Sequence, residues 1–419
     1  MAAHNDAHND VAKEAYVALD VGTTKVCCLV GEIGAGDETV EIMGMGIAPN
    51  CGLTDGRVSN VKETVEAIST AAEAAAEQSG FDLASVLVGI AGEHIKGLEI
   101  SGNASVRTGK VEEDDVNRVI QNAVTSNIGA ETRILAKVPL GYRLDGRPEL
   151  MNPLGLTATT MIVRLQVFTV DEIAYQDLLY CVQEAGLKTS KVILESVASA
   201  DAVLHPSEKE EGVILCDLGG GTTDLSLFYR GAVHHVYEIA QAGRALTNDL
   251  AEHFRIPADI AAQLKEEHGF CHYHDQDDVE MAYIEVANHA QTYSVKVDPL
   301  EMCHCLQNRL NEIFSLLCED LKKTSYANVA KSVVLTGGTA KLRGLPELCR
   351  EHFNLQVRVG YPLHVTGQED LVKSPIYSTA VGLLLHGPKS LPLDDPPAKG
   401  ASKSGSSFWS RIKRFFFGD

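Results

Sequence analysis

Apolar runs alternate with amphipathic stretches along most of the chain. Short apolar or alternating runs predict strands, at 16–19, 25–31, 85–90 and 160–170. Helical spacing predicts a helix over 61–78 that ends near Gly80. It predicts another over 112–123, whose acidic start suits a helix N-terminus. Strands that alternate with helices in this way indicate an α/β fold.

One local pattern occurs twice. In each copy an apolar strand leads into an aspartate, a glycine turn with threonines and a second strand. The copies read Asp20-Val-Gly-Thr-Thr-Lys25 and Asp217-Leu-Gly-Gly-Gly-Thr-Thr-Asp224, the second flanked by apolar runs at 212–216 and 225–229. An internal duplication explains the match.

These turns have a common chemical capacity. A turn of this kind presents backbone N–H groups and hydroxyls to an anion, as phosphate-binding loops do, and an aspartate at a strand end suits Mg²⁺ held through water. Two such turns facing each other across a cleft would hold a triphosphate, whereas either alone also fits an ordinary tight hairpin. A third turn, Gly337-Gly-Thr339, follows a predicted strand at 332–335. It suits packing against the flat face of adenosine, with a plain β–α turn as the alternative.

The composition narrows the function classes. Asp plus Glu number 57 against 36 Lys plus Arg, so the formal net charge is −21, which argues against a general nucleic-acid binder. The ten cysteines form no CxxC pair, so no zinc ribbon or thioredoxin-type site is expected. The start lacks the apolar segment of a signal peptide, and no apolar run approaches the ~18 residues that span a bilayer. We therefore expect a cytoplasmic protein with at most peripheral membrane contact.

The C-terminal end differs from the acidic body. Residues 389–407 are rich in Pro, Gly and Ser and predict a flexible linker. In the following segment, 408–417, apolar side chains fall within about a third of the helix circumference and cations lie opposite. This predicts an amphipathic helix that binds anionic lipid, with docking on the protein's own domain as the alternative. The residues assigned to membrane contact are Phe408, Trp409, Arg411, Ile412, Lys413, Arg414, Phe415 and Phe416.

Taken together, the motifs resemble the actin, Hsp70 and sugar-kinase ATPase superfamily, and within it the bacterial FtsA cell-division family. The resemblance covers roughly residues 14–388 and resumes at the C-terminal aromatic segment. The residues that carry it are Ala18-Leu-Asp-Val-Gly-Thr-Thr-Lys-Val-Cys27, Gly89-Ile-Ala-Gly-Glu-His-Ile-Lys96, Asn152-Pro-Leu-Gly155, Gly243-Arg-Ala-Leu-Thr-Asn-Asp249 and Val334-Leu-Thr-Gly-Gly-Thr-Ala340.

The resemblance implies an actin-like ATPase fold, with two duplicated α/β domains, an FtsA-type 1C subdomain and a C-terminal amphipathic helix. The implied boundaries are 14–91, 171–208 and 374–388 for subdomain 1A, 92–170 for 1C, 209–245 and 329–373 for 2A, 246–328 for 2B, 389–407 for the linker and 408–417 for the helix.

It also implies ATP and Mg²⁺ as cofactors. Asp20 and Asp217 would hold Mg²⁺ through water, and Glu195 would orient the attacking water. The implied nucleotide-binding residues are Asp20, Gly22, Thr23, Thr24 and Lys25 in the first loop, Asp217, Gly219, Gly220, Gly221, Thr222 and Thr223 in the second, then Gly243, Asn248 and Lys265, and Gly337, Gly338 and Thr339 at the adenosine turn. Two positions depart from the family pattern. Ser196 stands where the family commonly has proline, and Ala262 stands where a glutamate usually contacts the ribose.

The function implied is a tether for the division machinery. The protein would polymerise at the cytoplasmic face of the inner membrane, at the septum. It would anchor the tubulin-like FtsZ ring through subdomain 2B and recruit later divisome proteins. ATP would act as a conformational and polymerisation switch, with at most weak hydrolysis. The alternative is a sugar or carboxylate kinase of the same superfold. That function needs an acceptor site with a catalytic aspartate, for which the sequence offers no convincing candidate, and it leaves the tail unexplained.

Overall fold

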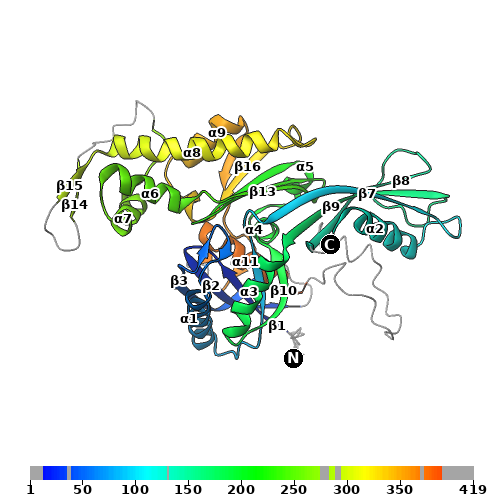
Figure 1. The fold of residues 1–419 in the computed structure, drawn as a ribbon, viewed down its shortest axis with the longest axis horizontal. Helices are drawn as coiled ribbons and strands as arrows, with labels where there is room; N and C mark the ends of the chain where they lie inside the picture. The colour runs from blue at the N-terminus through cyan, green and yellow to red at the C-terminus, as the bar shows by residue number, and fades with distance from the viewer. Residues whose placement is uncertain are drawn as a thin grey trace, which may run out of the picture.

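The computed structural model describes residues 13–34, 39–129, 132–273, 283–287, 294–368 and 372–388. The predicted linker and amphipathic helix lie outside these residues. The described chain forms a long bar with a second body below its middle (Figure 1). Within the described residues, none of the helices is both long enough and apolar enough to cross a bilayer.

Two sheets with the same topology form the centre of the molecule. The first has the order β10-β6-β1-β2-β3-β18 and the second the order β13-β12-β11-β16-β17. In each, three strands that follow one another are antiparallel, and two later strands extend the sheet in parallel beside the first of the three. The first sheet has one more strand, β18, which pairs in parallel with β3. This repeated order confirms the predicted duplication. The strands are β1 (Lys13–Val21), β2 (Lys25–Gly34), β3 (Val40–Pro49), β6 (Ser85–Ile90), β10 (Lys188–Leu194), β18 (Val365–Thr366), β11 (Val213–Leu218), β12 (Thr223–Tyr229), β13 (Ala232–Ile239), β16 (Ser332–Thr336) and β17 (Gln356–Val359).

Two short helices cross between the sheets, α4 (Glu195–Val203) and α11 (Ser378–Leu385). They approach closely because Gly382 has no side chain, and a Cβ there would lie 1.8 Å from the Ala198 carbonyl oxygen. Apolar side chains from both sheets, such as Leu19 and Leu215, belong to the one core around this crossing. The crossing therefore joins the two units.

Further helices cover the outer faces of the two sheets. In the first unit α1 (Val61–Ser79) packs on β3 and ends at Gly80, whose φ is 73°. The second unit has its own core under α6 and α8, at one end of the bar (Figure 1). The remaining elements of these units are β4 (Leu53–Thr54), β5 (Arg57–Val58), α3 (Glu172–Glu184), α5 (Pro206–Glu211), α6 (Gly243–Phe254), α7 (Ala258–His268), β14 (Ile284–Ala287), β15 (Ser294–Val297), α8 (Pro299–Leu321), η1 (Gly338–Lys341), α9 (Leu345–Phe353) and η2 (Pro375–Tyr377).

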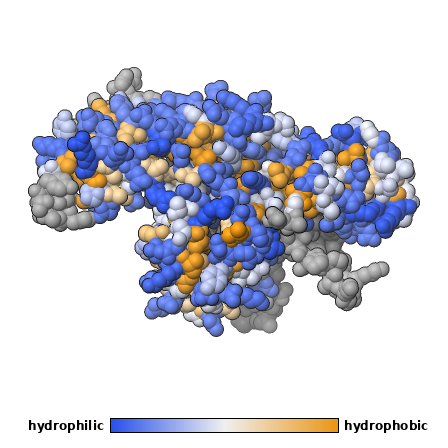
Figure 2. All heavy atoms as spheres, viewed as in Figure 1, coloured by the Kyte–Doolittle hydropathy of each residue, from blue (hydrophilic) through white to orange (hydrophobic). Residues whose placement is uncertain are grey.

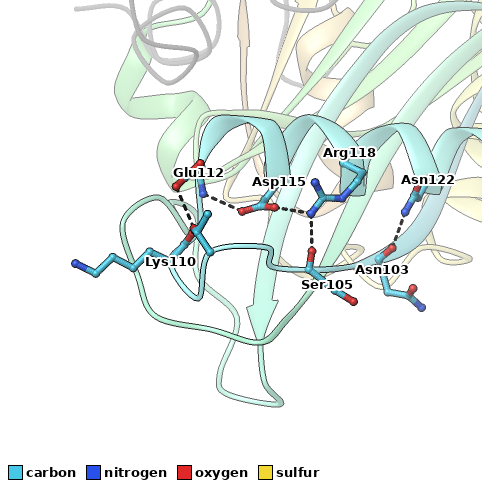
Figure 3. A network of polar contacts seen from close by, with 8 residues as sticks. Asn103, Ser105, Lys110, Glu112, Asp115, Arg118 and Asn122 are labelled. Carbon is cyan, nitrogen blue, oxygen red and sulfur yellow. Dashed lines mark hydrogen bonds and ion pairs between the residues drawn. The ribbon is translucent and has the colours of Figure 1, made fainter.

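The segment 92–170 forms the other end of the bar. Its sheet has the order β7-β9-β8, from β7 (Ile95–Ser105), β9 (Thr160–Asp171) and β8 (Thr132–Leu144), and α2 (Glu113–Asn127) covers one face. Figure 3 shows how α2 is fixed to the edge strand β7. Arg118 donates to the Ser105 carbonyl and pairs with Asp115, and the Asn122 amide donates to the Asn103 carbonyl at 3.0 Å.

The predicted elements are confirmed, with differences at their ends. The strand at 85–90 and the start of the first helix agree with the structure. β1 begins three residues before the predicted apolar run, because Lys13 already pairs with Gly34 of β2 although its side chain is exposed. Helix α2 extends to Asn127, whose amide donates to the Ala123 and Ser101 carbonyls. Hydropathy does not reach either end, since Lys13 and Asn127 are polar.

Candidate functional site

The two glycine turns close in the same way. The Gly22 amide donates to the Lys25 carbonyl at 3.0 Å, and the Gly219 amide donates to the Thr222 carbonyl at 3.0 Å. Each turn joins two antiparallel strands, so the residues between these bonds project beyond the sheet edge. The sequence resemblance between the turns is therefore also a resemblance of backbone geometry.

The turns contact each other across the gap between the units. A Cβ at Gly220 would lie 2.4 Å from Thr24 Oγ1, and a Cβ at Gly221 would lie 2.3 Å from Thr23 Oγ1. No side chain fits at such distances, so only glycine permits this approach. This contact brings the two turns together at one place.

A cavity of about 880 Å³ opens between the units. All but one of the residues predicted for the nucleotide site line it, namely Asp20, Gly22, Thr23, Thr24, Lys25, Glu195, Asp217, Gly219, Gly220, Gly221, Thr222, Gly243, Asn248, Lys265, Gly337, Gly338 and Thr339. The exception is Thr223, which is fully buried and whose hydroxyl donates to the Gln241 carbonyl at 2.6 Å. Strand alternation turns this side chain away from the cavity.

The third glycine turn packs directly on the second. Gly337 has φ of 84°, and a Cβ there would lie 2.4 Å from Asp217 Oδ1. The Thr339 hydroxyl donates to the Gly219 carbonyl at 2.9 Å. Glycine at 337 is thus required both by its backbone conformation and by the neighbouring carboxylate.

Three lysines line the cavity, and two of them, Lys25 and Lys265, are held by the neighbouring groups described next. Lys25 Nζ donates to the Ile376 carbonyl at 3.2 Å and lies 5.2 Å from the centre of the Tyr377 ring. Lys265 Nζ donates to the Gly243 carbonyl and to Thr247 Oγ1, each at 2.8 Å. Burial lowers the pKa of Lys265. Its two bonds tie α7 to the first turn of α6.

The carboxylates of the cavity are strongly perturbed by burial. Ser199 Oγ donates to Asp217 Oδ2 at 2.7 Å, yet burial still raises the pKa of Asp217 to about 6. Burial also raises the pKa of Asp20, against the opposing effect of Lys25. The pKa of Glu195, at the start of α4, is raised well above its usual range by burial and then by the neighbouring acids. Such groups are typical of functional sites.

Two acids that align with Asp217 across the sheet were missed by the sequence analysis. Asp224 lines the cavity directly opposite Asp217 in the register of β11 and β12, and Glu238 lies opposite Asp224 on β13. These three side chains form a row across three strands, which we call the acidic row. Asp224 could have been found, because it and Asp217 are placed symmetrically about the turn. Glu238 could not, because its place depends on the register of β13.

The charge of the cavity suits a cation bound together with an anion. Several carboxylates face Lys25 and Lys265 there, and the exposed backbone of the turns suits phosphate. Among the described residues, no three His, Cys, Asp or Glu side chains are arranged to hold a metal ion by themselves. Mg²⁺ usually keeps several waters and binds one or two carboxylates plus phosphate, which is what Asp20 and Asp217 can offer.

Comparison with known proteins identifies the family. The family model described as cell division protein FtsA matches residues 214–382, and the model described as the SHS2 domain inserted in FtsA matches residues 92–169. The cell division protein FtsA of Pseudomonas aeruginosa is 35% identical over 422 residues, covering 96% of this chain and 97% of that protein. The chain belongs to the FtsA family of cell-division proteins.

Solved structures confirm that this FtsA-family chain has an actin-like fold. The PilM–PilN type IV pilus biogenesis complex matches with a TM-score of 0.64 at 16% identity, over 89% of this chain and 98% of that one. MreB5 of Spiroplasma citri bound to ADP matches with a TM-score of 0.55 at 15% identity, over 89% of this chain and 96% of that one. At these identities the likeness concerns the fold alone.

Proposed function

We propose that this FtsA-family protein binds ATP with Mg²⁺ between its two units and uses the nucleotide as a switch for polymerisation. The observation that carries the proposal is the meeting of the two glycine turns at one cavity that also contains Asp20 and Asp217. MreB5, which shares this fold, was solved bound to ADP, and this supports a nucleotide as the ligand.

The turn geometry suggests how phosphates would be held. The amides of Gly22 and Gly219 already close the turns, so the amides and hydroxyls that follow, at 23–24 and 220–222, are the groups available to phosphate. Asp20 and Asp217 would hold the waters of Mg²⁺, which neutralises phosphate charge when bound. Gly337 and Gly338 leave room for the flat face of adenosine above the second turn.

Glu195 is our candidate for orienting an attacking water. It begins α4 and lies so close to β6 that a Cβ at Gly89 would be 2.9 Å from its Oε1. A carboxyl group with a pKa raised by burial can accept or hold a proton near neutral pH. Because α4 crosses α11 between the units, a change at this residue would also be felt at the junction.

For the whole protein we propose a membrane tether. Polymers of the chain would lie at the cytoplasmic face of the inner membrane at the septum, bind FtsZ through residues 246–328 and recruit later divisome proteins. Figure 2 shows a mainly hydrophilic face, and the net charge of −21 disfavours contact of the body with anionic lipid. Membrane contact would therefore fall to residues 408–417. One short helix binds the membrane reversibly, and a filament that carries many such helices would bind the membrane far more tightly.

Calorimetric titration of the full chain with ATP and with ADP, each with and without Mg²⁺, tests the nucleotide site. We expect Mg²⁺-dependent ATP binding that Gly221→Ala weakens at least about tenfold, because the added methyl group forces the turns apart. Gly129→Ala is the matched control, since no atom of the described residues lies within 4 Å of a Cβ there. Binding unaffected by Gly221→Ala would refute this site. Phosphoryl transfer to a sugar or carboxylate would favour the kinase alternative.

Co-sedimentation with anionic vesicles tests the tether. The full chain should pellet with vesicles when it polymerises in ATP, and a chain ending at residue 407 should not. A chain carrying Arg411→Glu and Arg414→Glu keeps the apolar residues and should bind weakly. Equal vesicle affinity of monomers and polymers, or binding without the tail, would contradict the proposal.

For the FtsZ contact, added FtsZ should slow amide exchange within residues 246–328.

A further inference from the structure

Arg244 lines the cavity, although it was not among the residues predicted for the nucleotide site. It is the second residue of α6, and its backbone amide donates to the Gly220 carbonyl at 2.7 Å. The side chain reaches the first unit, where Nη2 lies 3.7 Å from Asp55 Oδ1. Arg244 therefore links the second glycine turn to a loop of the other unit.

That loop is fixed to the first glycine turn. Asp55 lies between β4 and β5, at the tip of a short hairpin. Just before the hairpin, the buried Asn50 amide donates from Nδ2 to the Gly22 carbonyl at 2.8 Å and accepts at Oδ1 from the Gly52 amide at 2.9 Å. The pair of Arg244 and Asp55 thus connects the two glycine turns by a second route, beside their direct contact.

The hairpin packs at the end of the cavity that holds Glu195. A Cβ at Gly56 would lie 2.8 Å from the Ala91 carbonyl oxygen, directly after β6. Two residues earlier, a Cβ at Gly89 would lie 2.9 Å from Glu195 Oε1. If Glu195 orients the attacking water, the terminal phosphate of ATP would lie at this end, within the region that the Arg244 side chain enters.

The adenosine end of the cavity has cations of its own. A Cβ at Gly243 would lie 2.8 Å from Thr339 Oγ1, so α6 begins against the adenosine turn. There the guanidinium of Arg343 donates to the His268 carbonyl at 2.9 Å, and Lys265 is held by the first turn of α6. Arg244 is the next residue after Gly243, and its side chain reaches the hairpin instead.

The ion pair between Arg244 and Asp55 is weak enough to be exchanged. The two side chains are 41% and 53% exposed, and 3.7 Å is too long for a hydrogen bond. Exposed pairs of this kind contribute little to stability. A guanidinium on a phosphate can form two parallel charge-assisted hydrogen bonds, which are stronger. A phosphate at this end of the cavity can therefore take Arg244 from Asp55 at little cost.

We propose that Arg244 binds the terminal phosphate of ATP, and that Asp55 holds its guanidinium across the cavity when that phosphate is absent. ADP lacks the terminal phosphate, so the pair with Asp55 persists when ADP is bound. Whether the hairpin of the first unit is paired to α6 thus depends on which nucleotide is present. This role of Arg244 rests on the proposed function, because it requires the nucleotide in the cavity.

Calorimetric titration of the full chain with ATP and with ADP, both with Mg²⁺, tests this role. Arg244→Ala keeps the backbone bond to Gly220 and removes the guanidinium. ATP affinity should therefore fall at least about tenfold, while ADP affinity changes less than about threefold. Arg244→Lys keeps the charge without the planar fork, so its ATP affinity should lie between those of Arg244→Ala and the unmodified chain.

Arg57 provides the matched control. It lies in the same hairpin, its side chain is 50% exposed, and it pairs with Asp171, the N-cap of α3, at 3.5 Å. Arg57→Ala removes a cation from the hairpin without touching the pair at Asp55, and both affinities should stay as in the unmodified chain.

Asp55→Asn tests the holding contact itself. Asparagine tolerates the φ of 53° at this position, so the hairpin is kept. Arg244 is released, and ATP affinity should rise about twofold to fivefold, while the same change in Arg244→Ala should have no effect.

The outcomes separate this role from the nucleotide site as a whole. A chain that binds neither ATP nor ADP refutes the proposed function, and this role with it. If both nucleotides bind, and Arg244→Ala weakens them equally or weakens neither, the role of Arg244 is overturned and the nucleotide site stands. An effect of Asp55→Asn that persists in Arg244→Ala overturns the exchange between Asp55 and phosphate.

Discussion

The two α/β units share a backbone and differ in the chemistry of one row of side chains. In the first unit the strands β1, β2 and β3 align Asp20, Cys27 and Ile47. In the second, β11, β12 and β13 align Asp217, Asp224 and Glu238 at the corresponding positions. One acid is thus common to both rows, and the second unit has two more.

This difference shows how a duplicated fold divides its tasks. The turn and its aspartate are kept in both copies, because both sides of the cavity need backbone amides and a carboxylate. The remaining positions are free to diverge. Cys27 has no exposed surface and belongs to the main core, and burial raises the pKa of its thiol to about 12. The first row, Asp20, Cys27 and Ile47, therefore contributes Cys27 to the core, whereas all three residues of the second row are acids.

We expect the largest loss of stability when Cys27 of the first unit is replaced by aspartate, the residue at the corresponding position of the second unit. Cys27→Asp places a carboxylate in a closed core, directly opposite Asp20, and we expect a loss of about 3–5 kcal/mol in the free energy of unfolding. Cys27→Asn, of the same shape without the charge, should cost only about 1–3 kcal/mol. Urea denaturation measures both. If both variants lose the same free energy of unfolding, charge is not what keeps an acid out of this position in the first unit.

The next largest effect is expected at Gly337, the glycine that packs against Asp217. Gly337→Ala combines a positive φ with a Cβ 2.4 Å from the Asp217 carboxylate, so we expect a loss of about 1–3 kcal/mol together with weaker ATP binding. Gly338→Ala is the control, since its nearest neighbour would be Ile376 at 3.8 Å. It should stay within about 0.5 kcal/mol of the unmodified chain. Similar losses in the free energy of unfolding for Gly337→Ala and Gly338→Ala would contradict the assigned role of Gly337.

A gain in stability is expected within the acidic row. Burial and the neighbouring aspartates raise the pKa of Asp224 well above its usual range, so at neutral pH its ionised form destabilises the fold. Asp224→Asn removes this cost, and the free energy of unfolding should rise by about 1–2 kcal/mol at pH 7. The gain should vanish on acidification, because the unmodified carboxyl is then protonated as well. Thermal unfolding across pH measures this, and a loss of stability at pH 7 would count against the assignment.

The rows also show what the sequence can predict. Asp20 and Asp217 were found because the motif around each is local, and the repeated motif predicted the duplicated sheet. Asp224 lies within the quoted motif and is placed opposite Asp217 by the turn alone. Glu238 and Ser199 reach the site through the register of β13 and the packing of α4, which no local pattern records. For the same reason the two-residue strand β18, paired with Val40, was not predicted.

The smallest effect concerns the acid that the two rows share. The pKa of Asp20 is raised by burial and lowered by the charge of Lys25. Asp217 accepts a hydrogen bond from Ser199, and burial still raises the pKa of Asp217 to about 6. Mg²⁺ requires the ionised carboxylate, so Mg²⁺-dependent ATP affinity should fall as pH drops through about 6, by at most tenfold per pH unit.

Ser199→Ala removes a donor that favours the ionised form, so the midpoint of this pH dependence should move upward. Calorimetric titration from about pH 5 to 8 measures the shift, and we expect it to be no more than about one pH unit. Ser196→Ala, in the same helix, is the matched control because its hydroxyl has no hydrogen-bond partner in the part of the chain that the structure describes, and it should leave the midpoint unchanged. If both serine variants shift the midpoint equally, the effect comes from the packing of α4 and not from the bond to Asp217.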